Sequence, residues 1–300
     1  AVSNGSVEFR VSGGVVTVPG AVNETVVTVA AGQTVTDSTV LTGDTVLVKR
    51  GAGTLVLTLA HSHTGGLVVE EGEVVIRNAA ALNGGPLDIR AGARVTLDTG
   101  VSRVPVSALM LDTAGRLDVA RAGLAIAAGG FDAAAVRQAI VAGRSGGTWT
   151  GTSGITSAAA ASTAGRAVGY APGSNGSLVV AFAASGDTNL DGQVSVVDLV
   201  AIQSSGVYGT GGAAAWFQGD SNYDGVVSVV DMVAMQSSGV YGQGNYNPAP
   251  ASQAAAPSSQ ATVSTATTSE APSIFKLAFA SLAEEQGSAS KATKKAFAAL

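Results

Sequence analysis

The sequence predicts a mainly β fold: a parallel β-solenoid in the N-terminal region, a small α-helical calcium-binding domain after it, and a disordered tail. Glycine recurs at a near-constant step in the first 130 residues. Two near-identical acidic loops come later, one beginning at Asp187 and the other at Asp220. Residues from 248 onward are rich in Ala, Ser and Thr. The composition agrees, because 40 glycines and only 12% charged residues leave mostly small and β-branched side chains, which suit pleated surfaces.

Residues 1–130 are predicted to form about six coils of roughly 20 residues each. In each, an alternating apolar strand precedes a bend glycine, and a second alternating strand follows. The bend glycines step by 19, 21, 19, 20 and 23 residues: Gly13, Gly32, Gly53, Gly72, Gly92 and Gly115. A coil of this size buries its inward side chains only by stacking on its neighbours. An antiparallel sandwich with regularly spaced hairpins is the alternative.

One stretch of this region also carries a family motif. Residues 49–57 read KRGAGTLVL, residues 63–69 read HTGGLVV, and Gly72-Glu73-Val74 follows. The pattern resembles the autotransporter-associated β-strand repeat, with His63 where that family usually has Tyr and Val74 where Leu is common. The resemblance implies a surface-exposed β-helical stalk or passenger module and no particular chemistry.

Two clusters of ionisable side chains in the solenoid region are candidates for enzyme chemistry, one of glutamates and one of histidines. Glu70, Glu71 and Glu73 gather at one bend, which is typical of a solvated turn rather than of the spaced carboxylate pair of a glycosidase. His61 and His63 have no evident third ligand, so a structural role is favoured over a metal site or a general base. No residue is assigned a catalytic role.

A connector is predicted over residues 131–185. Asp132 is expected to cap a short helix that ends at Gly143. Two strands, 166–171 and 177–183, are expected to form a hairpin over the turn at 173–176. Trp149 and Tyr170 are interpreted as core residues.

Residues 186–247 contain two near-identical acidic loops that predict two bound Ca²⁺ ions. In each loop, short side chains at positions 1, 3 and 5 point at one centre, a glycine at position 6 reverses the chain, and positions 7, 9 and 12 complete an all-oxygen shell. The predicted ligands are Asp187, Asn189, Asp191, Gln193 (through its carbonyl), Ser195 and Asp198, then Asp220, Asn222, Asp224, Val226 (through its carbonyl), Ser228 and Asp231. Mg²⁺ fits less well because it needs a tighter octahedron.

Each loop leads into a predicted helix, 196–205 or 229–238, and neither follows a convincing entering helix. With Asp at position 12, this duplicated loop–helix unit resembles a type I dockerin domain. That resemblance implies attachment to a cohesin-type protein module through positions 10, 11, 17 and 18, counted from the start of each loop. In this chain these are Val196, Val197, Gln203 and Ser204, and in the second copy Val229, Val230, Gln236 and Ser237. Dockerins often have Ser or Thr at positions 10 and 11, and the alternative is that these valines pack the helices within the domain.

Residues 248–300 are predicted to be a low-complexity linker with a C-terminal amphipathic segment near 273–282. The chain has no cysteine, which excludes disulfides and thiolate chemistry, and its net charge of −5 disfavours a nucleic-acid partner. No apolar stretch reaches the length of a transmembrane segment. The start at Ala1 is interpreted as a processed piece of a longer precursor.

These observations predict a secreted or cell-surface bacterial protein with a structural and interaction role: a β-solenoid stalk that presents a calcium-stabilised, dockerin-like module. One alternative is the C-terminal part of a secreted polysaccharide-degrading enzyme, a hydrolase or lyase with a polysaccharide partner. A surface adhesin is the other.

Overall fold

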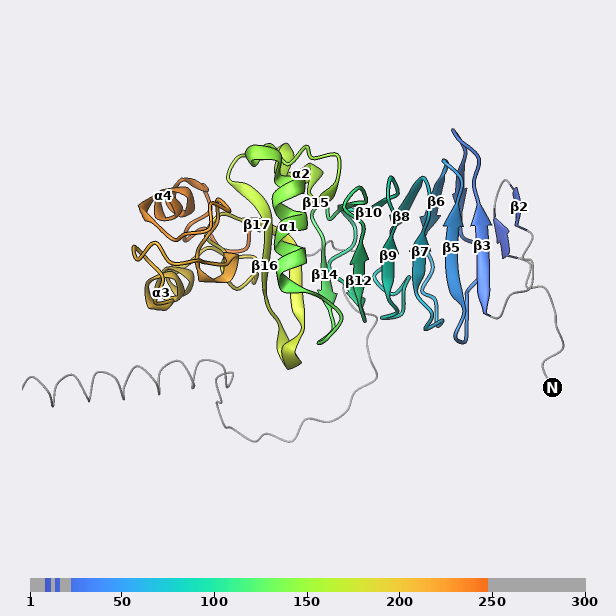
Figure 1. Cartoon of the computed structure of the whole chain (residues 1–300), viewed down its shortest axis with the longest axis horizontal. Coiled ribbons are helices and arrows are strands. Elements are labelled where there is room, and N and C mark those ends of the chain that lie inside the picture. The colour runs from blue at the N-terminus through green and yellow to red at the C-terminus, as the bar shows by residue number, and fades with distance from the viewer. Residues whose placement is uncertain (1–8, 12–13, 17–22, 248–300) are drawn as a thin grey trace, which may run out of the picture. The chain divides into compact units, whose positions relative to one another are not determined.

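The structure, a computed structural model, describes residues 9–11, 14–16 and 23–247 (Figure 1). Two parallel sheets run through its first half. One contains β3 (Glu24–Thr28), β5 (Val46–Arg50), β7 (Leu67–Val69), β9 (Leu87–Ile89) and β12 (Leu109–Leu111). The other contains β4 (Thr34–Thr36), β6 (Thr54–Leu57), β8 (Glu73–Ile76), β10 (Arg94–Leu97), β13 (Arg116–Asp118) and β15 (Gly154–Thr156). The chain alternates between the sheets, so the parallel β-solenoid is confirmed and the antiparallel sandwich is wrong.

The number of coils differs from the prediction. The described residues contain five coils, from β3–β4 to β12–β13. The segment before Gly13 instead forms β1 (Phe9–Val11), which pairs antiparallel with β2 (Gly14–Val16). Only two residues separate these strands, and a two-residue connection joins antiparallel strands, whereas parallel strands need a long crossover.

The solenoid core is a set of aliphatic ladders. Leu47, Leu67 and Leu87 lie in register on adjacent strands of one sheet, and all three are buried. Leu55, Val74 and Val95 form the equivalent buried ladder in the other sheet. Each coil therefore covers the apolar face of the next, which explains why a single coil has no core of its own.

The bend glycines Gly53, Gly72 and Gly115 lie close against the coil before them. Gly72 has a φ of 69°, and a Cβ atom there would lie 2.5 Å from both the Gly51 and Gly53 carbonyl oxygens of the preceding coil. Any other residue would clash with that backbone as well as strain its own. At Gly32 and Gly92 a Cβ would meet nothing within 4 Å, and the positive φ of 75° and 76° is what favours glycine there. The near-constant glycine step thus has two causes, packing between bends and a left-handed backbone.

The connector follows the last coil. It contains α1 (Ala133–Arg144), η1 (Ser145–Gly147), α2 (Ala158–Ala161) and a hairpin of β16 (Arg166–Pro172) and β17 (Leu178–Ala184) around η2 (Ser174–Gly176). The Asp132 side chain caps α1 by accepting from the amides of Ala134 and Ala135. A third sheet, in the order β11 (Val104–Val106), β14 (Gly123–Ile126), β17, β16, joins the hairpin to the solenoid. Trp149 and Tyr170 are buried here.

Helices α3 (Val196–Ser204) and α4 (Val229–Ser237), with η3 (Trp216–Gln218) between them, make up the last described part. Ile202 and Met235 are buried in its small core with Val194 and Val227. Val196, Val197, Val229 and Val230 are all exposed, so the alternative that they pack the helices within the domain is wrong. Each helix has nine residues, and of its apolar side chains only Ile202 or Met235 is fully buried, which leaves its valines facing solvent.

The predicted linker and amphipathic segment, residues 248–300, lie outside the described residues. Within the described part of the chain, no helix has the length and apolar character needed to cross a membrane.

His61 and His63 lie at a corner of the solenoid, where both are buried with their ring centroids 5.4 Å apart. The Leu41 amide donates to His61 Nδ1 at 3.1 Å, so that nitrogen carries no proton, and His61 Nε2 faces Asp37 Oδ2 at 3.2 Å. Burial of its ring and the neighbouring His61 lower the pKa of His63, and a contact with the Gly66 carbonyl opposes them only in part. The corner therefore holds a neutral His63.

We expect acid to weaken the solenoid at this corner. Because the folded-state pKa of His63 lies below its ordinary value of 6.5, the unfolded chain binds more protons as the pH falls below 6.5, and stability is lost there. Replacement His63→Leu should therefore reduce the fall in melting temperature between pH 7.5 and pH 5. Asp187, whose pKa is raised to about 7, acts in the opposite direction in this window, so the test is the difference between variant and wild type. An identical pH dependence in both would contradict the prediction.

Candidate metal centres

The first predicted calcium loop joins β17 to α3. Its position-1 residue, Asp187, is fully buried and accepts hydrogen bonds from the Gly192 amide at Oδ2 (3.1 Å) and the Asp191 amide at Oδ1 (3.3 Å). Gly192, at position 6, has a φ of 85° that brings its N–H back toward the carboxylate. The loop thus wraps around the first predicted ligand.

Positions 3 to 7 form a chain of short contacts. Asn189 Oδ1 accepts from the Asp191 amide at 3.0 Å, and Asn189 Nδ2 donates to Asp191 Oδ2 at 3.1 Å. Asp191 Oδ1 accepts from the Gln193 amide at 2.8 Å. The side chains at positions 3 and 5 therefore contact each other and the backbone that leads to position 7.

Position 12 also caps the helix that follows. Asp198 Oδ2 accepts from the Ser195 amide at 2.9 Å in a capping box at the start of α3. Its Oδ1 accepts from the amide and hydroxyl of Thr188, at 3.0 and 2.9 Å. The buried carboxylate thereby ties the end of the loop to its beginning.

The second loop, between η3 and α4, repeats all but one of these contacts; the exception is the amide bond to Oδ1 of the position-1 carboxylate. The Gly225 amide donates to Asp220 Oδ2 at 3.1 Å, and Asn222 Nδ2 donates to Asp224 Oδ2 at 2.9 Å. The Val226 amide donates to Asp224 Oδ1 at 3.0 Å. Asp231 Oδ2 accepts from the Ser228 amide at 2.9 Å. Both loops hold their predicted ligand residues in one arrangement.

Each position-1 carboxylate also has a donor from outside its loop, which sequence reasoning missed. The Tyr246 hydroxyl donates to Asp187 Oδ2, and Arg137 Nη2, from α1, donates to Asp220 Oδ2 at 3.1 Å. These donors are 59 and 83 residues away in the sequence, so no local pattern could have revealed them.

Burial disfavours the charged form of both position-1 carboxylates. Burial raises the pKa of Asp187 to about 7, although the Tyr246 and Gly192 hydrogen bonds oppose the rise. Burial also raises the pKa of Asp220, with Arg137 opposing. Among the described residues no hydrogen bond reaches the buried Oδ1 of Asp220. A cation beside these carboxylates would offset the cost of burying their charge.

Carboxylates alone do not complete either centre. In residues 9–11, 14–16 and 23–247, no group of three or more His, Asp or Glu side chains converges closely enough to hold a metal ion. Calcium takes six to eight oxygens and accepts amide, hydroxyl and main-chain carbonyl oxygens. A shell in these loops therefore requires the uncharged oxygens at positions 3, 7 and 9 as well as the aspartates.

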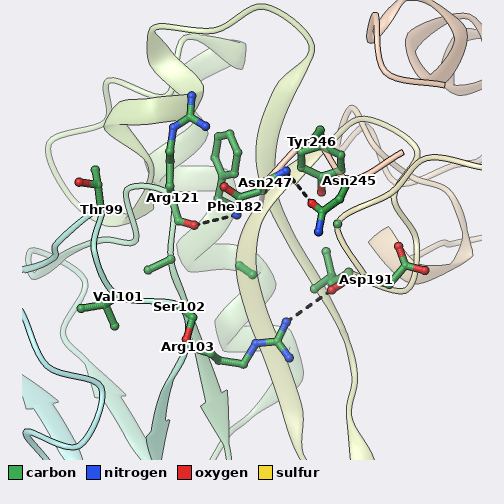
Figure 2. A pocket seen from close by; sticks show the side chains of 14 residues that line it. Thr99, Val101, Ser102, Arg103, Arg121, Phe182, Asp191, Asn245, Tyr246 and Asn247 are labelled. Carbon is green, nitrogen blue, oxygen red and sulfur yellow. Dashed lines mark hydrogen bonds between the residues drawn. The ribbon is translucent and has the colours of Figure 1, made fainter. Parts of the chain in front are cut away.

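A cavity of about 450 Å³ lies beside the first loop (Figure 2). Asp191 and Gly192 form part of its lining, so solvent reaches loop positions 5 and 6 from this side. Arg103, which also lines it, donates to the Leu190 carbonyl at 3.4 Å, and the Arg121 guanidinium lies 5.5 Å from the Phe182 ring centroid.

The acidic bend of the solenoid holds no spare carboxylate. Glu70 pairs with Arg50 at 2.5 Å, Glu71 accepts from the Gly51 amide at 3.1 Å, and Glu73 accepts from the Thr96 hydroxyl at 2.8 Å. All three side chains therefore link neighbouring coils, which accounts for the cluster without a catalytic role.

Residues 47–76 match the family model described as Passenger-associated-transport-repeat. The matched residues cover most of the two coils from β5 to β8, so the repeat motif read in residues 49–74 is confirmed. The match covers 30 of 300 residues and describes this repeat only. No curated protein and no solved structure matches the chain. A passenger-associated repeat within a β-solenoid fits a surface, passenger-like protein with a structural or adhesin-like role.

Proposed function

We propose that the chain is an extracellular structural and interaction protein of a bacterial surface. In this proposal the solenoid is a stalk, and residues 186–247 are a calcium-stabilised, dockerin-like module that attaches to a cohesin-type partner. The passenger-associated repeat supports the stalk part. The duplicated loop–helix units support the module.

Calcium is the metal that the loop chemistry favours. The ligands would be Asp187, Asn189, Asp191, Ser195 and Asp198 with the Gln193 carbonyl, and in the second loop Asp220, Asn222, Asp224, Ser228 and Asp231 with the Val226 carbonyl. Every donor is a hard oxygen, and the chain has no cysteine to offer a soft ligand. Oδ1 of Asp220 is buried and has no hydrogen-bond partner among the described residues, which is the observation that most directly supports a bound cation. When bound, calcium would hold each loop against the start of its helix.

The observation that carries the attachment proposal is a pair of apolar faces in solvent. Val196 is 62% exposed on α3, and Val229 is 65% exposed on α4. Val200 and Val233, one turn further along, are exposed as well. Exposed apolar side chains gathered on one element favour a protein partner.

The two faces are near-copies of each other. Gln203 and Ser204 end α3 as Gln236 and Ser237 end α4, and the Ser204 and Ser237 hydroxyls both donate to the carbonyl four residues earlier at 2.7 Å. A partner that recognises one helix therefore meets the same chemistry on the other. We expect two equivalent orientations of one cohesin-type partner.

Binding of the full chain to a panel of purified cohesin modules, measured by surface plasmon resonance, tests this proposal. We expect binding in calcium and none in EDTA. Replacing Val196 and Val197 by Asp should leave binding through α4, and replacing Val229 and Val230 as well should weaken it at least about a hundredfold, because charges would be buried in the interface. Met110, 47% exposed on β12, gives a control: Met110→Asp should change nothing. Full affinity in the fourfold variant, or no calcium-dependent binding across the panel, would overturn the attachment.

A further inference from the structure

The two proposed calcium loops differ in the outside donor to their position-1 carboxylate, although their sequences nearly repeat. In both, the position-1 carboxylate accepts at Oδ2 from the position-6 glycine and from one outside donor. In the first loop that donor is the neutral Tyr246 hydroxyl. In the second it is the cationic guanidinium of Arg137.

Arg137 is held firmly at the second loop. Besides its contact with Asp220 Oδ2, its Nη2 donates to the Tyr223 carbonyl at 3.4 Å, and its guanidinium carbon lies 5.9 Å from the Tyr223 ring centroid. Tyr223 is loop position 4 and is itself buried. The arginine thus contacts both a proposed metal ligand and the backbone of the loop.

The two loops also differ at Oδ1, the second oxygen of the position-1 carboxylate. In the first loop, Asp187 Oδ1 accepts from the Asp191 amide at 3.3 Å. The equivalent oxygen of the second loop is Asp220 Oδ1. Among the described residues that oxygen has no hydrogen-bond partner, and Asp220 is fully buried. The second loop therefore has one carboxylate oxygen available to a metal, but the other oxygen of that carboxylate is already paired with the positively charged Arg137.

We propose that the two loops are unequal calcium sites, and that Arg137 makes the second one weaker. The proposal rests on calcium binding as proposed above and adds which loop is weaker and which residue is responsible. A fixed positive charge on one ligand carboxylate repels a divalent cation, and in this partly exposed setting the effect on affinity is on the order of tenfold. Arg137 is a positioning and charge-tuning residue, not a metal ligand.

This arrangement also links the weaker site to the solenoid end of the chain. Arg137 belongs to α1, which packs on β15, the last strand of the second solenoid sheet. Ion binding in the second loop therefore meets the charge of a connector residue that contacts a ligand carboxylate directly. The first loop also has an arginine beside it, Arg103, but that guanidinium donates to the Leu190 carbonyl instead of a ligand carboxylate.

Isothermal titration of the full chain with calcium chloride tests the inference. We expect two steps whose dissociation constants differ by about tenfold. Asp191→Ala should remove the tighter step and Asp224→Ala the weaker one. Arg137→Gln should tighten the weaker step by about tenfold, and Arg137→Lys, which keeps the charge, should tighten it much less. Arg144→Gln, which removes the same charge from the last turn of α1, is the matched control and should change neither step.

Equal affinities in the wild type would overturn the inference while calcium binding stands. So would a weaker step that Arg137→Gln leaves unchanged or weakens further, because the arginine would then serve only to position Asp220. An equal gain with Arg137→Lys would overturn the charge argument. A flat titration of the wild type is a different result, since it overturns the calcium proposal itself.

Discussion

Replacing Lys49 by Met should lower the melting temperature of the protein by about 10 °C. Lys49 lies on β5 and is fully buried, yet its ammonium group has three acceptors at the bends. Nζ donates to the carbonyls of Arg50 (3.0 Å), Gly51 (2.6 Å) and Glu71 (3.1 Å). Because Glu71 belongs to the next coil, one side chain fastens two successive bends.

Two opposing effects decide the size of this change. Three partly buried carbonyls that lose their donor cost about 2 kcal/mol each. The substitution also removes a buried charge: burial lowers the pKa of Lys49 from 10.5 to about 8, with Glu71 opposing, which corresponds to about 3 kcal/mol. The carbonyl effect is larger, so the net loss is about 3 kcal/mol, and a unit of this size loses about 2–4 °C per kcal/mol.

Arg50→Met is the matched control for this prediction. Arg50 is the next residue on the same strand, its side chain is 48% exposed, and its pairing with Glu70 lies in solvent. An exposed ion pair contributes under about 1 kcal/mol, so this variant should melt close to the wild type. Equal melting temperatures for the two variants would contradict the role given to Lys49.

The pH dependence gives a second measurement. The folded-state pKa of Lys49 lies below its ordinary value, so the unfolded chain binds more protons between pH 8 and 10.5. Wild-type stability should therefore gain relative to Lys49→Met as the pH rises through this window. A constant difference would show that the ammonium carries no burial cost.

The solenoid could be predicted from the sequence because every coil repeats one local requirement. The bends need glycine either because it packs on the carbonyls of the coil before it, as at Gly72, or because its φ is positive, as at Gly92, so glycine recurs with each coil. The first segment was wrongly predicted to be a coil, because a strand, a glycine and a second strand also describe a hairpin. The two-residue gap between Val11 and Gly14 was the available signal.

The contacts of the two acidic loops were likewise only partly predictable from the sequence. Contacts within a loop, such as that of Asp187 with Gly192, follow from spacing and could be predicted. Arg137 and Tyr246 could not, because α1 and the segment after α4 meet the loops only through the tertiary fold. The exposure of Val196 also depends on the fold: a nine-residue helix anchored by Ile202 and partly by Leu199 leaves its valines uncovered.

Replacing Trp216 by Ala should be the most damaging change near the loops. Trp216 is fully buried in η3, between the two loops, and its indole N–H donates to the Asp187 carbonyl at 2.7 Å. Its ring lies 5.7 Å from that of Tyr223. On β16, Gly169 leaves room for it, since a Cβ there would lie 2.5 Å from the indole. One side chain therefore contacts both loops and the connector.

We expect Trp216→Ala to cost about 3–5 kcal/mol, because the loops cannot collapse into the space that an indole leaves. Thermal denaturation followed by circular dichroism should show the melting temperature falling by about 10 °C or more. Trp216→Phe keeps most of the ring and loses the hydrogen bond to Asp187, so it should cost only about 1–2 kcal/mol. The difference between these variants separates packing from hydrogen bonding.

Phe217→Ala is the matched control, because Phe217 is the next residue and is partly exposed, with its ring 6.3 Å from Tyr170. It should cost about 1 kcal/mol or less. If Trp216→Ala melted no lower than Phe217→Ala, the indole could not be what joins the loops to the connector. If it melted lower only in the presence of calcium, the loops would depend on the indole to bind the ion, because Trp216 holds the carbonyl of the first proposed ligand residue.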